Sequence, residues 1–446
     1  MRLTKLSVSN YKSLRDISIS PGPLTVIVGA NASGKSNLAD FYDFLSDLYK
    51  HGLSVAVARK GGYENIAYRK MRRSRSAIAV ALTIEIPKEF SRMPRRPRIY
   101  YEDDLSDLRF SHSFSFKTQS QAIKSEFKIE SERITLERKV DDEWQLAAEA
   151  HLIDGKFGYH VDNTNSESAA SNATNLNALS VRDSDRFLGQ FRILKNLDEI
   201  FSDYESRGRS ELIFSTIDRL IPIFRRISTS LAAIKVFQLS TTTTREFGVP
   251  IPNPEMDRHG GNLPAVVDML MKNHLPVWKK ILGVMTQLLP GLTKIEVDYT
   301  HSRTLGLFFF EQGVGRPWSV SEISDGTIHS LALLVALHDP RCMMLVLEEP
   351  ENSIHTWILR LLMDAAKEGS EKKQILLTTH SKVVVDAVSP KDVWVMWRAN
   401  SESHIAILSS LDPDVLNLVD NGDLTTFELL DTGLILEALP PHMDEN

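Results

Sequence analysis

The amino-acid sequence predicts a mixed α/β protein, and three features support this prediction. Short runs of Val, Ile and Leu end in polar residues, which is typical of buried parallel strands. One of these runs leads through a glycine-rich loop into a segment with helical periodicity. Other regions show strand-like alternation, or apolar residues at helical spacing. We therefore expect an α/β core with an antiparallel β lobe and a compact helical insertion.

A first lobe is expected over residues 1–165. Its core elements are a strand at 24–28, a helix at 37–45 and a strand at 77–86. Beyond residue 91, short strands alternate with turns, which predicts an antiparallel continuation of the lobe. These strands are expected at 109–116, 125–129, 133–140, 144–149 and 156–161.

A helical insertion is expected within residues 166–260, where a loop rich in Asn, Ser and Ala at 162–182 leads into it. Two groups of apolar residues there fall near helical spacing. They are Phe187, Phe191, Leu194, Leu197 and Phe201, and then Ile213, Ile217, Leu220, Ile223 and Phe224. The pattern is too short and irregular for a coiled-coil rod. It predicts a compact subdomain that either hosts partner contacts or simply packs on the rest of the chain.

A second α/β lobe is expected over residues 261–400, and a tail of strand and helix over 401–446. Buried strands should end near Glu349 and near His380. The other expected elements are helices at 262–289 and 328–337, and strands at 294–299, 304–311, 393–397 and 404–408.

The stretch from Gly29 to Ser36 matches the phosphate-binding pattern G-x-x-x-x-G-K-[ST] at every fixed position. A strand precedes it and a helix follows it, which is the context that the motif requires. Backbone N–H groups and the helix N-terminus would hold phosphate oxygens. Lys35 would reach the β- and γ-phosphates, and the Ser36 hydroxyl would bind Mg²⁺. The nucleotide-binding residues are expected to be Asn31, Ala32, Ser33, Gly34, Lys35, Ser36 and Asn37.

Two carboxylates end the apolar run that begins at Met343. Because ligands bind at the carboxyl ends of parallel strands, we assign Glu348 to the metal ion and Glu349 to the general base that activates water. His380 ends the next apolar run and could bind the γ-phosphate, although a lone His is more often structural.

Ser324 and Gly326 lie where a helix is expected to begin. A hydroxyl and free N–H groups at a helix start can bind an anion. From the residues alone, however, a plain N-cap is the better interpretation of Ser324.

The order of these motifs resembles that of the ATP-binding-cassette (ABC) ATPases of the RecF/SMC/OLD group, specifically their AAA_21-type branch. That order is phosphate loop, long insertion, S-D-G-T, E-E-P-E-N-S-I-H and T-T-H-S. The opening strand with its N-Y-K-S turn, G-G-Y-E-N-I at 61–66 and G-G-N-L at 260–263 also resemble this group. The similar blocks cover about residues 1–85 and 260–400.

The resemblance implies a P-loop NTPase head of the ABC type that binds ATP and Mg²⁺ and works in pairs. Ser324 and Gly326 would touch the γ-phosphate bound to the partner subunit, so that ATP binding and dimerisation are coupled. Residues 351–355 would form a loop that crosses between the two sites. Lys12 and Ser13 would lie near the nucleotide.

Three positions depart from the family pattern. Glu348 stands where the metal-binding acid is usually Asp, the usual metal-sensing Gln is not found in the segment 63–69, and the crossing loop ends His355-Thr356 instead of His-Pro. The first two departures predict slow ATP hydrolysis.

Bulk composition limits the class of protein. The chain of 446 residues is 42% hydrophobic and 25% charged, which is ordinary for a globular protein. No apolar run is long enough to span a membrane, no signal peptide is recognisable, and Cys342 is the single cysteine. A reducing cytoplasm suits these features. The net charge of −6 does not indicate a general nucleic-acid binder, although basic clusters at 69–75 and 92–98 could meet a phosphate backbone or an acidic partner.

Three functions compete. The first is a homo-oligomeric ATP-driven switch that controls a separately encoded nuclease or toxin, in bacterial anti-phage defence. It is favoured because the stretch after His380 is too short for the nuclease domain of OLD proteins, and because Asp412 and Asp414 suit a turn better than a metal site. The second is a DNA-repair or chromosome-maintenance ATPase that clamps DNA, which only the basic clusters favour. The third, a transporter subunit, does not fit the opening strand.

Overall fold

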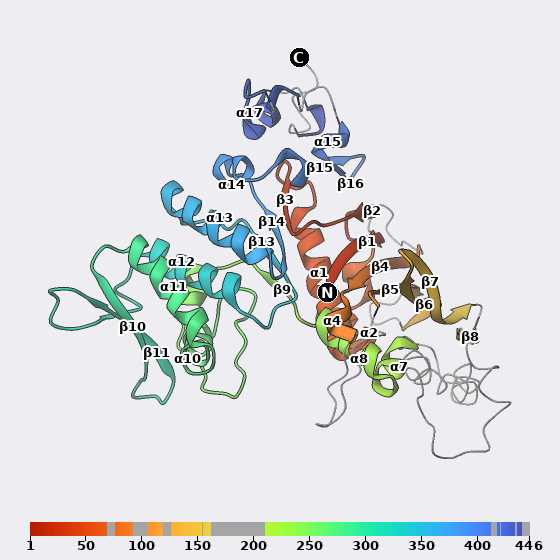
Figure 1. The fold of residues 1–446 in the computed structure, drawn as a ribbon, viewed down its shortest axis with the longest axis horizontal. Helices are drawn as coiled ribbons and strands as arrows, with labels where there is room; N and C mark the ends of the chain where they lie inside the picture. Colours follow the sequence, from red (N-terminus) through yellow and green to blue (C-terminus); the bar gives the residue numbers. More distant parts are fainter. Residues whose placement is uncertain are drawn as a thin grey trace. The chain divides into compact units, whose positions relative to one another are not determined.

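The structure is a computed structural model in which two compact units are distinguished (Figure 1). Unit 1 comprises residues 1–20, 44–232 and 401–403, and unit 2 comprises 21–43, 233–400 and 404–446. The four segments expected from the sequence divide the chain differently, and they stay a prediction. The structure describes residues 1–68, 76–91, 106–118, 126–153, 155–161, 210–411, 417–419, 421–432 and 435–438.

Unit 1 is built on an antiparallel sheet with the strand order β8-β7-β6-β5-β4-β1-β2. Residues alternate strictly between buried and half-buried in β4, so one face of the sheet is covered. The strands are β1 (Arg2–Tyr11), β2 (Leu14–Ile19), β4 (Ile78–Ile86), β5 (Leu108–Thr118), β6 (Phe127–Val140), β7 (Glu143–Ile153) and β8 (Lys156–Val161).

The covered face of this sheet lies against helices. Phe110 of β5 contacts Phe214 of α7 (Phe214–Leu220) and Phe224 of α8 (Pro222–Leu231), with ring centroids 5.5 and 5.9 Å apart. These helices confirm the helical spacing seen from Ile213 to Phe224, with a break before Pro222. The short helices α2 (Leu53–Arg59), α3 (Tyr63–Ile66) and α4 (Lys88–Ser91) complete the unit. The predicted loop at 162–182 and the predicted helix at 187–201 lie outside the described residues.

One strand prediction for this unit was wrong. Segments 125–129 and 133–140 were expected to be separate strands, but β6 runs unbroken from Phe127 to Val140. Glu132 interrupts the apolar pattern between them, yet its side chain is buried and hydrogen-bonded to His112 of β5. A buried, partnered carboxylate therefore looks like a strand end in the sequence.

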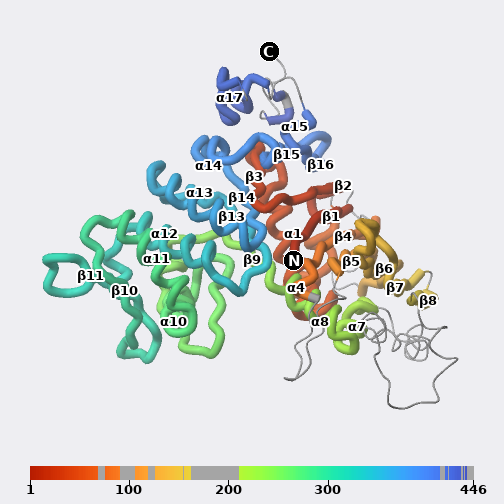
Figure 2. The backbone as a smooth tube through the Cα atoms, viewed as in Figure 1, coloured from red at the N-terminus to blue at the C-terminus, as the bar shows by residue number. Residues whose placement is uncertain are grey.

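Unit 2 contains parallel strands in the order β15-β3-β14-β13-β9. Figure 2 shows the path of the backbone through these strands. The strands β3 (Leu24–Val28), β14 (Gln374–Thr378) and β13 (Met344–Glu348) are buried at every position, as their apolar runs predicted. The other two are β9 (Ile234–Phe237) and β15 (Val393–Ala399), with β16 (Glu402–Ile407) beside β15. The four-residue β9 was not predicted, because a helical pattern was continued through it.

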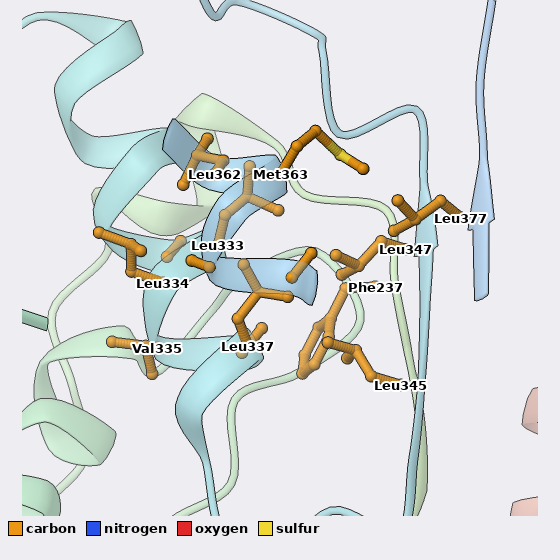
Figure 3. Packing of buried hydrophobic residues seen from close by; sticks show 14 of the residues in the cluster. Phe237, Leu333, Leu334, Val335, Leu337, Leu345, Leu347, Leu362, Met363 and Leu377 are labelled. Atoms are coloured by element: carbon orange, nitrogen blue, oxygen red, sulfur yellow. The ribbon is translucent and has the colours of Figure 1, made fainter. Parts of the chain in front are cut away.

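Apolar helices cover this sheet. In Figure 3, Leu333 and Leu337 of α12 (Asp325–His338) and Leu362 of α13 (Thr356–Ser370) lie among Leu345 and Leu347 of β13. Helix α12 is buried from Thr327 to Leu337, which makes it the central helix of this layer. Cys342 is buried beside β13, and burial raises the pKa of its thiol to about 11, which agrees with an inert apolar residue.

The remaining described elements of unit 2 follow the predicted order. The segment 262–289 forms two helices with His274 between them, and Pro276 lies in the first turn of the second, where proline is favoured. They are α10 (Leu263–Asn273) and α11 (Leu275–Leu288), followed by the small antiparallel sheet β10 (Leu292–Tyr299), β11 (Leu305–Glu311) and β12 (Trp318–Ser319). Shorter helices are α9 (Thr241–Thr244), α14 (Lys382–Asp386), α15 (Leu408–Leu411) and α17 (Thr426–Asp431). None of the helices in the described ranges has the length and apolar character needed to cross a membrane.

Candidate nucleotide site

The glycine loop joins β3 to α1 (Lys35–His51), as the motif predicts. A Cβ at Gly29 would lie 1.9 Å from the carbonyl oxygen of Met396, so only glycine fits against β15 there. Gly34 has φ 114°, a conformation that other residues rarely adopt. The first helical turn is closed by a 3.0 Å bond from the Leu38 amide to the Gly34 carbonyl. The first backbone N–H groups of α1 therefore lie at the end of the helix that follows the loop.

Lys35 is the first residue of α1, and its side chain turns back toward the glycine loop. Its ammonium donates to the carbonyl oxygens of Gly29 at 2.7 Å and Ala30 at 3.1 Å, and the residue is only 6% exposed. Burial lowers the pKa of Lys35 to about 8, and Glu349 and Glu351 oppose that shift. The charge is thus costly to bury, and its hydrogen bonds go to carbonyl oxygens, so an anionic phosphate would be a better partner.

Sheet register brings the predicted acids and the phosphate loop to one edge. Glu348 pairs with Thr378 across β13 and β14, and Thr378 pairs with Ile27 across β14 and β3. All three strands are parallel, so the glycine loop, the Glu349 turn and the His380 turn emerge side by side. Among the predicted site residues, Lys35, Glu348, Glu349 and His380 are brought to this edge.

Glu348 is held by an arginine that the sequence analysis missed. Its side chain is 2% exposed, and Oε1 accepts a 2.5 Å hydrogen bond from Arg258 Nη2. The other terminal nitrogen of Arg258 lies 3.5 Å from Asp40 and 3.8 Å from Asp43, both on α1. No described hydrogen bond engages Glu348 Oε2. No local pattern could have identified Arg258, because its partners are distant in the sequence.

Glu349 occupies a strained turn. Its φ is 46°, in the left-handed region that costs free energy for a residue with a side chain. The Glu349 amide donates to the Thr378 carbonyl at 2.8 Å, and its Oε2 accepts from the side-chain amide of Asn352 at 3.1 Å. The carboxylate therefore leaves the strand in a direction fixed by the backbone and by Asn352.

Glu351 binds the turn that carries His380. Its Oε1 accepts from the Thr379 hydroxyl at 2.7 Å and from the His380 amide at 2.8 Å. Its Oε2 is buried with no hydrogen-bond partner. Burial and the nearby Lys35 lower the pKa of His380, so that its imidazole is neutral at pH 7 and can donate or accept a hydrogen bond.

Ser324 is the N-cap of α12, as its position predicts. Its hydroxyl accepts from the Thr327 amide at 3.2 Å, and the side chain is exposed. Arg245 holds the preceding loop through the Val320 carbonyl, the Ile323 carbonyl at 2.6 Å and the Asp325 carboxylate at 2.6 Å. The structure therefore fixes the backbone at this helix start, and the proposed contact with a partner's nucleotide stays a prediction.

The remaining predicted residues fall elsewhere. Lys12 and Ser13 belong to unit 1, where the Lys12 amide donates to the Ile66 carbonyl at 2.7 Å and the two hydroxyls of Ser13 and Ser403 lie 2.7 Å apart. Their role at a nucleotide stays a prediction. The basic clusters at 69–75 and 92–98, and Asp412 to Asp414, lie outside the described residues.

The residues at the sheet edge fit Mg²⁺. Ser36 is exposed and Glu348 has an oxygen without a described partner, so both offer the oxygen ligands that Mg²⁺ prefers. In the described part of the chain, no group of three or more His, Cys, Asp and Glu side chains could hold a metal ion by itself.

Comparisons with known proteins identify the family. A family model described as "AAA domain, putative AbiEii toxin, Type IV TA system" (AAA_21) matches residues 24–386. No curated protein sequence matches the chain significantly.

Structures of SMC head domains are also similar. An Smc head bound to the C-winged helix domain of ScpA has 12% identity and a TM-score of 0.49, and covers 91% of this chain and 97% of its own. The SMC head domain from Thermotoga maritima has 14% identity, a TM-score of 0.41, and coverage of 91% and 99%. An Smc head from Pyrococcus furiosus, bound to the C-terminal domain of ScpA, has 12% identity, a TM-score of 0.45, and coverage of 95% and 99%. Since these TM-scores are below 0.5, the family match carries the assignment. The chain belongs to the AAA_21 family.

Proposed function

We propose that this protein is a Mg²⁺-dependent ATPase that acts as a nucleotide-driven switch in a head-to-head homo-oligomer. The observation that carries the proposal is the single sheet edge at which the glycine loop, Glu348, Glu349 and His380 emerge. A buried lysine whose hydrogen bonds go to carbonyl oxygens and a strained glutamate are typical of sites that are completed by a ligand.

In this mechanism each residue has one task. The loop and Lys35 bind the phosphates, and Ser36 with Glu348 would hold Mg²⁺, which neutralises charge on the phosphate oxygens. Glu349, directed by Asn352, accepts a proton from the attacking water. Neutral His380, whose backbone Glu351 holds, hydrogen-bonds the γ-phosphate.

We further propose that the switch controls a separately encoded effector, a nuclease or toxin, in bacterial anti-phage defence. The family description names a toxin of a toxin–antitoxin system, which supports a defence setting. ATP would act by stabilising the closed oligomer, with Ser324 and Gly326 on the nucleotide of the partner subunit. Closing the oligomer would then release or activate the effector.

Native mass spectrometry of the wild type and of Glu349→Gln, with and without ATP and Mg²⁺, tests this proposal alongside phosphate release. We expect Glu349→Gln to retain ATP, to accumulate the closed oligomer and to hydrolyse about a hundredfold to ten-thousandfold more slowly. If the oligomeric state is the same with and without ATP, and the variant hydrolyses ATP at the wild-type rate, the assignment of the site residues is wrong.

A further inference from the structure

The turn from Asp257 to Asn262 is built more tightly than a helix start requires. Asp257 Oδ1 accepts from the amides of His259 at 2.8 Å and Gly261 at 2.9 Å. Gly260 has φ +93°, and a Cβ there would lie 2.3 Å from Thr244 Cγ2. A Cβ on Gly261 would lie 2.2 Å from Asp257 Oδ2. Asn262 precedes α10 but makes no side-chain cap. The two glycines therefore serve the turn itself.

This turn places Arg258 at the active edge of the sheet. The Arg258 carbonyl accepts from the Gln238 amide at 2.9 Å, directly after β9. β9 is the parallel neighbour of β13, and Phe237 pairs with Leu347, so Gln238 lies level with Glu348. From this position the side chain of Arg258 reaches the Glu348 carboxylate directly.

Charge explains why an arginine is held there. Glu348, Asp40 and Asp43 surround Arg258, whose side chain is 25% exposed while that of Glu348 is 2% exposed. A buried carboxylate without a partner is costly, and Arg258 satisfies one of its two oxygens. The other oxygen, Oε2, has no described hydrogen bond.

We propose that Arg258 is a positioning residue for the metal ion, because it fixes Oε1 of Glu348 so that Oε2 faces the bound cation. A glutamate has one more rotatable bond than an aspartate, so it loses more conformational entropy when it is fixed. The ion pair confines the side chain before the metal arrives. This inference rests on the proposed function, since it assigns a task to Arg258 only if Glu348 serves Mg²⁺.

Binding of a fluorescent, non-hydrolysable ATP analogue tests the proposal. Its dissociation constant is measured in EDTA and in saturating Mg²⁺. The constant in EDTA divided by the constant in Mg²⁺ reports how much the metal strengthens binding. We expect Arg258→Ala to lower that ratio about tenfold, because loss of a residue that holds a metal ligand commonly weakens metal binding by at least that much. The affinity in EDTA should change less than about twofold. Lys235→Ala is the matched control, because Lys235 pairs with Glu255 at 2.8 Å and does not contact Glu348.

The outcomes separate the two proposals. If the wild type does not bind the analogue, the proposed function fails and this inference fails with it. If the wild type responds to Mg²⁺ and Arg258→Ala gives the same or a larger ratio, only the role of Arg258 is overturned. Arg258→Lys keeps the charge but not the planar fork, so we expect a ratio below that of the wild type. A wild-type ratio in Arg258→Lys would mean that charge alone matters, which also overturns the positioning role.

Discussion

Two groups of buried polar side chains, one in each unit, are built in opposite ways. In unit 1, His112 is fully buried between Tyr49, 2.7 Å from Nδ1, and Glu132, 3.1 Å from Nε2. Both oxygens of Glu132 also accept backbone amides, those of Ile213 at 2.6 Å and Phe214 at 2.8 Å. Each ring nitrogen and carboxylate oxygen of this group has a partner within the protein.

The polar groups of unit 2 are left incomplete. Glu351 has one oxygen that is buried without a partner, and Ser33 in the glycine loop has a hydroxyl in the same state. Lys35 is buried, and its hydrogen bonds go to carbonyl oxygens. Because unsatisfied buried groups are costly, the Ser33 hydroxyl and the Glu351 oxygen at this sheet edge are typical of a site that awaits a ligand, whereas the satisfied group of unit 1 is structural.

The largest effect is expected where the satisfied group is broken. Glu132→Ala removes the hydrogen bond to His112 and leaves the amides of Ile213 and Phe214 without their carboxylate. Because three buried groups then lack a partner, we expect the free energy of unfolding of unit 1 to fall by about 3–5 kcal/mol. Chemical denaturation measures the loss, and hydrogen exchange should show faster exchange at the two amides. An unchanged exchange rate there would mean that Glu132 does not hold the start of α7.

A histidine in unit 2 sharpens the comparison with His112. His329 on α12 is 2% exposed, and its Nδ1 is buried without a partner. Burial lowers the pKa of His329 to about 4 from 6.5, and Asp325 opposes the shift. Between those values the unfolded chain binds a proton that the folded chain does not. The associated stability is therefore fully present above pH 6.5 and is lost as the pH falls toward 4.

This loss can be measured with His329→Leu. From pH 7.5 to 5, protonation of His329 in the unfolded chain should cost about 2 kcal/mol of unfolding free energy. The leucine variant should lack that part of the pH dependence, while a control His404→Leu, which changes a half-buried histidine, should retain it. Parallel curves for wild type and His329→Leu would show that this histidine does not titrate as its burial predicts.

Sequence reasoning located the parts of the site that a local pattern defines. Gly29 to Ser36 and the apolar run ending in Glu348 and Glu349 fold as predicted, because a strand with its following loop is a local unit. It missed β9, which is four residues long and depends on pairing with β13 for its identity. Short strands stabilised by tertiary contacts carry little signal of their own.

The partners of the proposed catalytic side chains were missed for a related reason. Arg258 meets Glu348 across 90 positions of sequence, so only the sheet order brings them together. Asn352 is close in sequence to Glu349, but its role depends on the left-handed backbone at Glu349, which the residue type does not reveal. Residues that orient other side chains can therefore be identified only from the structure, whereas the residues proposed to contact phosphate can be identified from the sequence motif.

The smallest effect is expected at Asn352, because it acts on the proposed base, the half-buried Glu349, through one hydrogen bond. Asn352→Ala should slow ATP hydrolysis about fivefold, close to 1 kcal/mol, with unchanged affinity for ATP. Phosphate release under saturating ATP measures the rate, and Asn352→Asp serves as the comparison. The aspartate would place a like charge 3.1 Å from Glu349 Oε2 and should slow hydrolysis further. If both variants hydrolyse at the wild-type rate, the strained backbone alone directs Glu349. The orientation of this carboxylate would then not depend on a side-chain partner, in contrast to the buried group of unit 1.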